Sequence, residues 1–238
     1  MPQYSFLPLS RHADYGFGAT ADAFKEAADG LTASQIEAPR LNGHLPTAFL
    51  YRHAIELYLK SMIVLLHRRL HIPFGSHSAD GEPCVLVQGQ VRPFHRVHSV
   101  AKLFSYFERL VAQHAPTLAT FCHTDWTAIP YETHEWIRLI EETDATSTFF
   151  RYPNPQARAG DHAKSSFQTS SPEELIAAAS PSGPPIKAAV ILDESDSVVE
   201  TFCLNSEVMP DMQVALRSLA ELLEAAHFGM RIELAGGW

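Results

Sequence analysis

The fold depends on one apolar stretch, which reads FLYRHAIELYLKSMIVLL at positions 49–66. Its apolar side chains fall on every side of a helix, and a helix of that kind is buried at the centre of its domain. The stretch also contains Arg52, His53, Glu56 and Lys60. Four ionisable groups within one span argue against a membrane helix, so we expect no association with a membrane.

Four further segments have the pattern of helices that pack around this centre. The central helix is expected over about residues 46–71, and the others over 19–29, from 98 or 99 to 111, over 132–146 and over 210–227. In the segment from 98 or 99 to 111, apolar residues recur at the spacing of a helix. Ser99 is a natural N-cap, and Gly30 and Gly229 are expected to end their helices.

Two short β-hairpins are expected between the helices. One lies at residues 85–91, and the other pairs 188–192 with 198–204 around a turn at 193–196. Residues 153–185 are rich in Ser, Ala, Pro and Gly, which predicts a long surface loop with one short helix over 172–178, begun at Ser171.

The sequence therefore predicts a mainly α fold. We expect a single domain over residues 1–238, a helical bundle around one long central helix with two small peripheral β-hairpins. The loop 153–185 and the hairpin 186–204 are interpreted as insertions before the C-terminal helix.

Composition and charge narrow the class of protein. The chain has 238 residues, 46% of them apolar, and three cysteines far apart in the sequence. An odd number of cysteines implies no disulfide framework, so a cytoplasmic location is expected, and the first ten residues lack the pattern of a signal peptide. The net charge is −9, which argues against a nonspecific nucleic-acid coat. Residues 40–111 nevertheless carry 9 basic and 4 acidic side chains, against 3 and 11 in residues 171–238.

Three charged residues of the central helix share one face. Arg52, Glu56 and Lys60 stand at i, i+4 and i+8, and a buried charge needs a partner. They form either an internal ion-pair network or the polar floor of a pocket for a ligand or phosphate. Spacing alone does not separate these two interpretations.

The helix RHAIELYLK at residues 52–60 resembles the core helix of HEPN-type helical proteins. His98, at the head of the next helix, occupies the position of that superfamily's histidine. The segment FFRYP at 149–153 is similar to the Arg-Tyr-Pro of several HEPN branches. The resemblance covers about residues 46–153 in three short pieces.

This resemblance implies a function for the chain. HEPN proteins are small helical bundles that commonly dimerise, and many are metal-independent ribonucleases of toxin–antitoxin and phage-defence systems. Others are noncatalytic nucleotide- or RNA-binding partners. The resemblance thus implies RNA as a ligand, a homodimer, a partner or antitoxin protein, and no cofactor. The catalytic branch carries Arg, four to six residues, then His; Arg92 and His98 have that spacing, as do Arg109 and His114, but neither pair adjoins the Arg-Tyr-Pro segment.

Candidate site residues follow from the resemblance and from the chemistry of RNA cleavage. A metal-free cleavage needs a base, an acid and a cation for the phosphate. His98 is the candidate acid or base, since histidine titrates near neutral pH. Arg52 or Arg92 would hold phosphate, with His53 beside them. Such a pocket is expected to be shared across a dimer.

Four further residues are candidates for binding: Glu56, Lys60, Arg151 and Tyr152. Arg151 is expected to turn inward with the preceding Phe149 and Phe150 and to pair with Glu56.

Other chemistry has little support in the sequence. His67 and His71 stand at a spacing that can chelate zinc, but no acidic residue lies between them, and we expect no metal site. The chain contains no Gly-x-Ser-x-Gly, no phosphate-binding loop and no dinucleotide fingerprint. The alternative to an RNA-acting protein is a noncatalytic helical adaptor whose acidic C-terminal part binds another protein.

Overall fold

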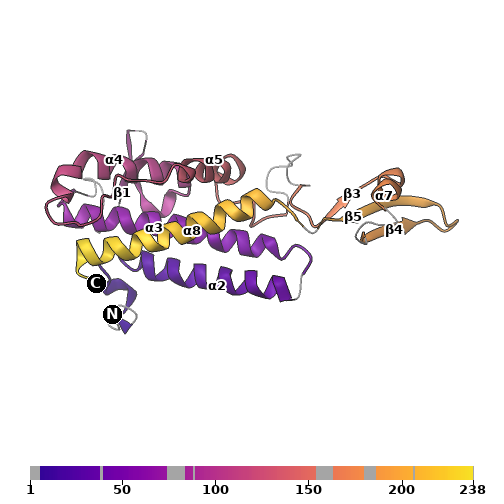
Figure 1. The fold of residues 1–238 in the computed structure, drawn as a ribbon, viewed down its shortest axis with the longest axis horizontal. Helices are drawn as coiled ribbons and strands as arrows, with labels where there is room; N and C mark the ends of the chain where they lie inside the picture. The colour runs from indigo at the N-terminus through magenta and orange to yellow at the C-terminus, as the bar shows by residue number, and fades with distance from the viewer. Residues whose placement is uncertain are drawn as a thin grey trace.

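A bundle of helices around α3 forms the body of the molecule (Figure 1). The computed structural model describes residues 6–37, 40–73, 84–87, 89–153, 163–179, 186–205 and 207–237. The bundle helices are α2 (Phe17–Glu37), α3 (His44–Arg69), α4 (Val100–Leu118), α5 (Glu132–Asp144) and α8 (Pro210–Ala235). Helix α3 contacts α2, α4 and α8, and α5 packs against α4 and α8. The fold is mainly α, as the sequence predicts.

Helix α3 is the buried centre of this bundle. Ile55, Leu59 and Met62 are 0% exposed, which confirms the prediction made from the apolar stretch. Burying one such side chain contributes about 1.5–3 kcal/mol to stability. The helix ends at Arg69, two residues before the predicted end, and His71 lies beyond it with a φ of 54°.

Helix α2 continues past the glycine that was expected to end it. The sequence predicts an end at Gly30, whereas the helix runs to Glu37. A glycine inside a helix costs only about 1 kcal/mol, and contacts with α3 offset that cost. Beyond Gly30, Thr32 lies 3.3 Å from the hydroxyl of Tyr51, which in turn donates to Asp29 at 2.6 Å.

The predicted end of α8 at Gly229 is also wrong. The helix continues to Ala235 and ends at Gly236, which has a φ of 63°. A Cβ on Gly229 would lie 2.9 Å from the ring of Trp126, so this glycine makes room for an indole. Trp126 is held there because its Nε1 donates to Glu233 on the next turn of α8, at 2.9 Å.

The first hairpin lies against the bundle. Strands β1 (Cys84–Val87) and β2 (Gln90–Pro93) pair antiparallel, close to the predicted 85–91, and β1 contacts α4. The 3₁₀ helix η2 (Phe94–Arg96) follows, with Phe94 1% exposed. A second short 3₁₀ helix, η1 (Leu9–Arg11), precedes α2.

The second hairpin belongs to a projecting unit, which we call the arm and define as residues 166–179 and 186–205 (Figure 1). It contains β3 (Phe167–Thr169), α7 (Pro172–Ala178), β4 (Ala188–Leu192) and β5 (Val198–Leu204), with strand order β3-β5-β4. The β4–β5 hairpin and α7 lie where the sequence predicts them, and a capping box begins α7. Strand β3 lies in the expected loop and was missed, because three residues are too short for a recognisable pattern.

The arm is fixed to the bundle at its base. Asn42, in the turn before α3, and Ser166 exchange two hydrogen bonds, of 2.9 and 2.7 Å. Where the arm returns, the amide of Asn205 donates to the carbonyl of Ser166 at 2.8 Å. His44 Nε2 also lies 2.8 Å from the carbonyl of Lys164. The first residue of the arm is thus bonded to the turn before α3, and the last residue is bonded to the first.

A buried carboxylate joins three helices at the other end of the bundle. Asp14 accepts hydrogen bonds from the amide of Gly18 at 2.7 Å and from Ser61 of α3 at 2.6 Å. His227 of α8 lies 3.6 Å from the same oxygen. Burial raises the pKa of Asp14, but the nearby His227 and the hydrogen bonds from Ser61 and Gly18 lower it more, so the group is ionised.

Gly30 and Gly18 both lie in α2, but replacing each with alanine should have opposite effects on stability. Gly30 has open space where a Cβ would be, so Gly30→Ala should stabilise the protein by roughly 0.5–1 kcal/mol. A Cβ on Gly18 would lie 2.2 Å from His227 and 2.7 Å from Asp14. Gly18→Ala should therefore destabilise it by about 2 kcal/mol or more. Urea unfolding of the wild type and both variants measures this. Equal effects of the two substitutions would contradict the packing described here.

Candidate functional site

The charged face of α3 forms a buried ion-pair network. Arg52, Glu56 and Lys60 are 0%, 1% and 3% exposed. Arg52 Nη1 donates to Glu56 Oε2 at 2.6 Å, and Lys60 Nζ donates to Glu56 Oε1 at 2.7 Å. Of the two interpretations that the spacing allowed, the structure shows the internal network for these three side chains.

The network keeps Glu56 ionised although it is buried. Burial raises the pKa of Glu56, but the hydrogen bond with His98 and the positive charges of Lys60 and Arg52 lower it more, and the pKa falls from its ordinary 4.5 to about 2. The carboxylate therefore carries a full charge at neutral pH and fixes the two cations beside it.

Arg52 joins α3 to two other elements. Its Nη2 donates to the backbone carbonyl of His98 and, at 3.4 Å, to that of Asp144 at the end of α5. Its Nε lies 3.5 Å from Asp144 Oδ2. The other carboxylate oxygen of Asp144 accepts from the amides of Thr148 and Phe149 at 2.7 and 3.0 Å. Burial nevertheless leaves the pKa of Asp144 above its ordinary value.

His98 brings this network to the surface. Its side chain is 50% exposed, and its Nδ1 lies 3.2 Å from Glu56 Oε1. It directly precedes Ser99, the predicted N-cap of α4, whose Oγ accepts from the amide of Lys102 at 3.1 Å. The same hydroxyl donates to Glu141 of α5 at 2.6 Å, which fixes the segment that carries His98. A buried anion thus orients one nitrogen of an exposed imidazole.

The structure places the other candidates around this centre in different environments. His53 is half-buried, its ring 4.6 Å from that of Phe24, and burial lowers its pKa. Arg92 is exposed on β2, where it donates to Gln90 at 2.9 Å. Tyr152 is 49% exposed, and its carbonyl accepts from Lys164 at 2.8 Å.

Two sequence-based predictions are wrong. Arg151 does not pair with Glu56: it is exposed, and its guanidinium lies 5.8 Å from the ring centre of Phe49 and 5.4 Å from that of Tyr152. Glu56 takes its cations from its own helix, which leaves no need for a cation from α5 or beyond. Arg52 cannot hold a phosphate, because it is fully buried and its donors are directed to protein oxygens.

The two histidines at zinc-chelating spacing are not brought together as ligands. His67 is buried, with Nε2 2.7 Å from the hydroxyl of Tyr106 and Nδ1 3.2 Å from the carbonyl of Ile72, whereas His71 lies beyond the helix. Within the described ranges, no group of three or more His, Cys, Asp or Glu side chains is placed to hold a metal ion. Nor does any helix in these ranges combine the length and apolar character needed to cross a bilayer.

A cavity of about 640 Å³ lies away from His98, at the junction between the bundle and the arm. Arg40, His44 and Lys187 contribute to its lining, with Ser166 and Asn205 from the base of the arm, and among the residues that the structure describes no acidic side chain lines it. The junction is therefore a basic region, although the arm beyond it is acidic.

Comparison with known proteins identifies no relative. No protein-family model, curated protein or solved structure matches the chain.

Sequence reasoning missed Asp144 and Glu141, which complete the site from α5. Both lie on a helix that the sequence predicts, but no local pattern shows that this helix faces Arg52 and Ser99.

The site predicts a specific pH dependence of stability. The pKa of Glu56 is lower in the folded chain than in the unfolded one, so its contribution is complete above pH 4.5 and is lost as the pH falls from 4.5 towards 2. The shift corresponds to roughly 3 kcal/mol. Glu56→Gln should cost about 3 kcal/mol at pH 7, because it removes the carboxylate that the buried cations Arg52 and Lys60 share. Unfolding free energies of both proteins at a series of pH values should therefore converge between pH 4.5 and 2.

The matched control is Glu142→Gln on α5. Glu142 pairs with Arg138 one turn away, but both side chains are more than half exposed, at 59% and 66%. An exposed pair of this kind contributes about 0–1 kcal/mol. A loss for Glu56→Gln as small as that of the control would contradict the assignment of Glu56 as the anion of the network.

Proposed function

We propose that the chain is a HEPN-like protein that binds or cleaves RNA in a toxin–antitoxin or phage-defence module, without a metal if it is catalytic. The observation that carries the proposal is the pairing of His98 with Glu56. An exposed imidazole directed by a buried carboxylate is the arrangement of a general base and its positioning residue. It occurs on the helix and at the histidine that carry the HEPN resemblance.

The pairing defines what His98 would do. In the proposed mechanism Glu56, an anion, accepts a hydrogen bond from Nδ1–H, and the reacting tautomer of His98 has its lone pair on Nε2. In the proposed reaction Nε2 takes the proton of a ribose 2′-hydroxyl. The 2′-oxygen then bonds to phosphorus, the bond to the 5′-oxygen breaks, and the leaving oxygen takes a proton from solvent. The products are a 2′,3′-cyclic phosphate and a 5′-hydroxyl end.

Cations for the phosphate would come from the basic part of the chain. Arg52 and Lys60 are committed to Glu56, so Arg92 on the exposed hairpin is the candidate that remains from the sequence. Phosphate contacts dominate the affinity for nucleic acids and make it dependent on salt. Residues 171–238, with 11 acidic side chains, are unsuited to that role.

The decisive experiment is an RNA-cleavage and binding assay with the full chain. We expect the wild type to cleave single-stranded RNA in the presence of EDTA and His98→Ala to lose cleavage. Arg92→Ala should weaken binding to all sequences and reduce the slope of log affinity against log salt by about 1. His95→Ala is the matched control, since His95 is also exposed and stands three residues away in η2.

Two results would contradict this proposal. One is the absence of RNA binding by the wild type at low salt. The other is binding and cleavage that are indifferent to His98 and Arg92. Thermal unfolding of each variant checks that a loss of activity is not a loss of fold.

A second candidate function is supported by the buried network itself. Arg52, Glu56 and Lys60 neutralise one another inside the bundle, as structural ion pairs do. If His98 only completes this network, the chain is a noncatalytic adaptor or nucleotide-binding partner that acts through protein–protein contacts. Alanine substitution of His98 would then change stability alone.

A further inference from the structure

The free edge of β4 is an unusual surface for a folded protein. All five residues of the strand, Ala188-Ala189-Val190-Ile191-Leu192, are exposed, and the last three are 48–50% exposed. The strand lies at the edge of the sheet, and within the described residues no other strand pairs with its outer side. Natural proteins protect such edges with charges, prolines or bulges, because an exposed apolar edge pairs readily with another chain. None of these lies within β4.

The hydrogen bonds show which backbone groups point outward. The carbonyl of Lys187 accepts from Leu204 at 2.8 Å, and the amide of Asp193 donates to Ser197 at 2.9 Å, so both residues face β5. Bonding groups alternate between the two sides of a strand. Ala188, Val190 and Leu192 therefore direct their amides and carbonyls to the free edge. The irregularity in the pairing lies at Ile191 and Leu192, where β5 and not β4 carries the extra residue.

The strand is complementary to itself in one register. If two copies of β4 pair antiparallel with Val190 opposite Val190, then Ala188 lies opposite Leu192. The outward-directed backbone amides and carbonyls of all three residues then form hydrogen bonds with the other copy. In the same register Lys187 of each copy lies opposite Asp193 of the other. A shift by two residues would place Lys187 opposite Ile191 or beyond the strand, and parallel pairing would bring like charges together.

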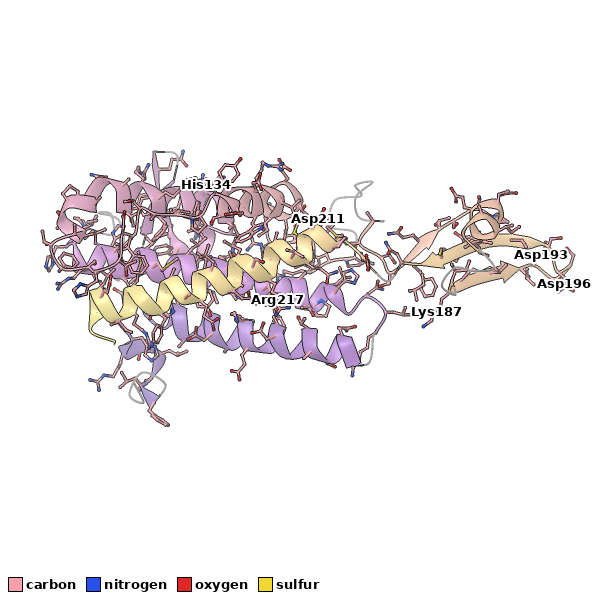
Figure 2. All side chains as sticks on the ribbon, in the orientation of Figure 1. His134, Lys187, Asp193, Asp196, Asp211 and Arg217 are labelled. Carbon is pink, nitrogen blue, oxygen red and sulfur yellow. The ribbon has the colours of Figure 1, made fainter. Side chains whose placement is uncertain are left out.

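The surroundings of β4 extend this charge complementarity. Lys187 lies at the junction with the bundle, and Asp193 and Asp196 lie at the tip of the arm (Figure 2). Antiparallel pairing therefore brings the acidic tip of one arm, which also contains Glu194, to the basic junction of the other. Lys187 and Arg40 line the cavity there.

We propose that two copies of the chain dimerise through their β4 strands and form a continuous six-stranded sheet, with Lys187–Asp193 pairs at both ends. The arrangement has twofold symmetry, because the same edge serves both copies. It joins the molecules through their arms, and so differs from the expected dimer in which two copies share the pocket at His98. The interface is small, so we expect a dissociation constant in the micromolar range.

Sedimentation velocity over a micromolar concentration series tests this proposal on the full chain. We expect a monomer–dimer equilibrium for the wild type. Val190→Pro should weaken the dimer at least about tenfold, because it removes an outward donor at the twofold axis. It should leave the arm folded, since no bond to β5 is lost. Ile176→Thr is the control, because Ile176 is 74% exposed on α7 but lies off the edge.

The Lys187–Asp193 pair provides a test that distinguishes the proposed dimer from nonspecific association. Asp193→Asn should weaken the wild-type dimer, yet strengthen the dimer of Lys187→Glu, because there it removes a repulsion. Asparagine keeps the Oδ1 acceptor that Asp193 offers to Ser195 and Ser197, so the turn is preserved. A monomer at every concentration, a dimer insensitive to Val190→Pro, or equal losses for Val190→Pro and Ile176→Thr would each overturn the proposal.

Discussion

The rest of the bundle depends on the burial of one ionised carboxylate, that of Glu56. A helix as apolar as α3 could rotate or slide against its neighbours with little change in buried apolar area. The charges remove that freedom. Arg52 pairs its Nη2 group only when the His98 carbonyl and the end of α5 are in place, and Glu56 is stable only with its two cations. A mispacked helix would leave a buried charge without a partner, which costs several kcal/mol. The network thus selects one arrangement among many apolar ones.

Asp14 plays a comparable part on another side of α3. It receives hydrogen bonds from the start of α2 and from Ser61, and it faces His227 of α8. The two carboxylates fix α3 to different neighbours, Asp14 to α2 and α8 and Glu56 to the segments at α4 and α5. They differ in one respect that matters for function. His227 is 2% exposed, whereas the side chain of His98 is 50% exposed. Only the second pair presents a titratable nitrogen to solvent, which is why the proposed chemistry is placed there.

Much of the fold could be predicted from the sequence because its elements are long and regular. The all-round apolar pattern of α3, the N-cap at Ser99 and the capping box of α7 are local signals, and the structure confirms them. The ends of α2 and α8 could not be predicted in this way. In the sequence, Gly30 and Gly229 resemble helix C-termini, but both helices continue past them because tertiary contacts stabilise the later turns.

Of the candidate site, only the spacing of the charged residues along α3 could be predicted from the sequence. The alignment of Arg52, Glu56 and Lys60 on one face followed from the helix, and so did the need for partners. Which partners they take depends on contacts between residues that are distant in sequence, and no periodicity reports such contacts. Arg151 was therefore misplaced, and Asp144 was not recognised.

The hydrogen bond that joins the two ends of the arm has a consequence for how such a chain can change over evolutionary time. Because the amide of Asn205 donates to the carbonyl of Ser166, the polypeptide leaves the bundle and returns to it at nearly the same point. A segment with adjacent ends behaves as a cassette. It can be lengthened, exchanged or excised while the helices on either side keep their packing. The bundle and the arm can therefore evolve independently. The bundle is constrained by its buried charges, and the arm by whatever its exposed strands contact.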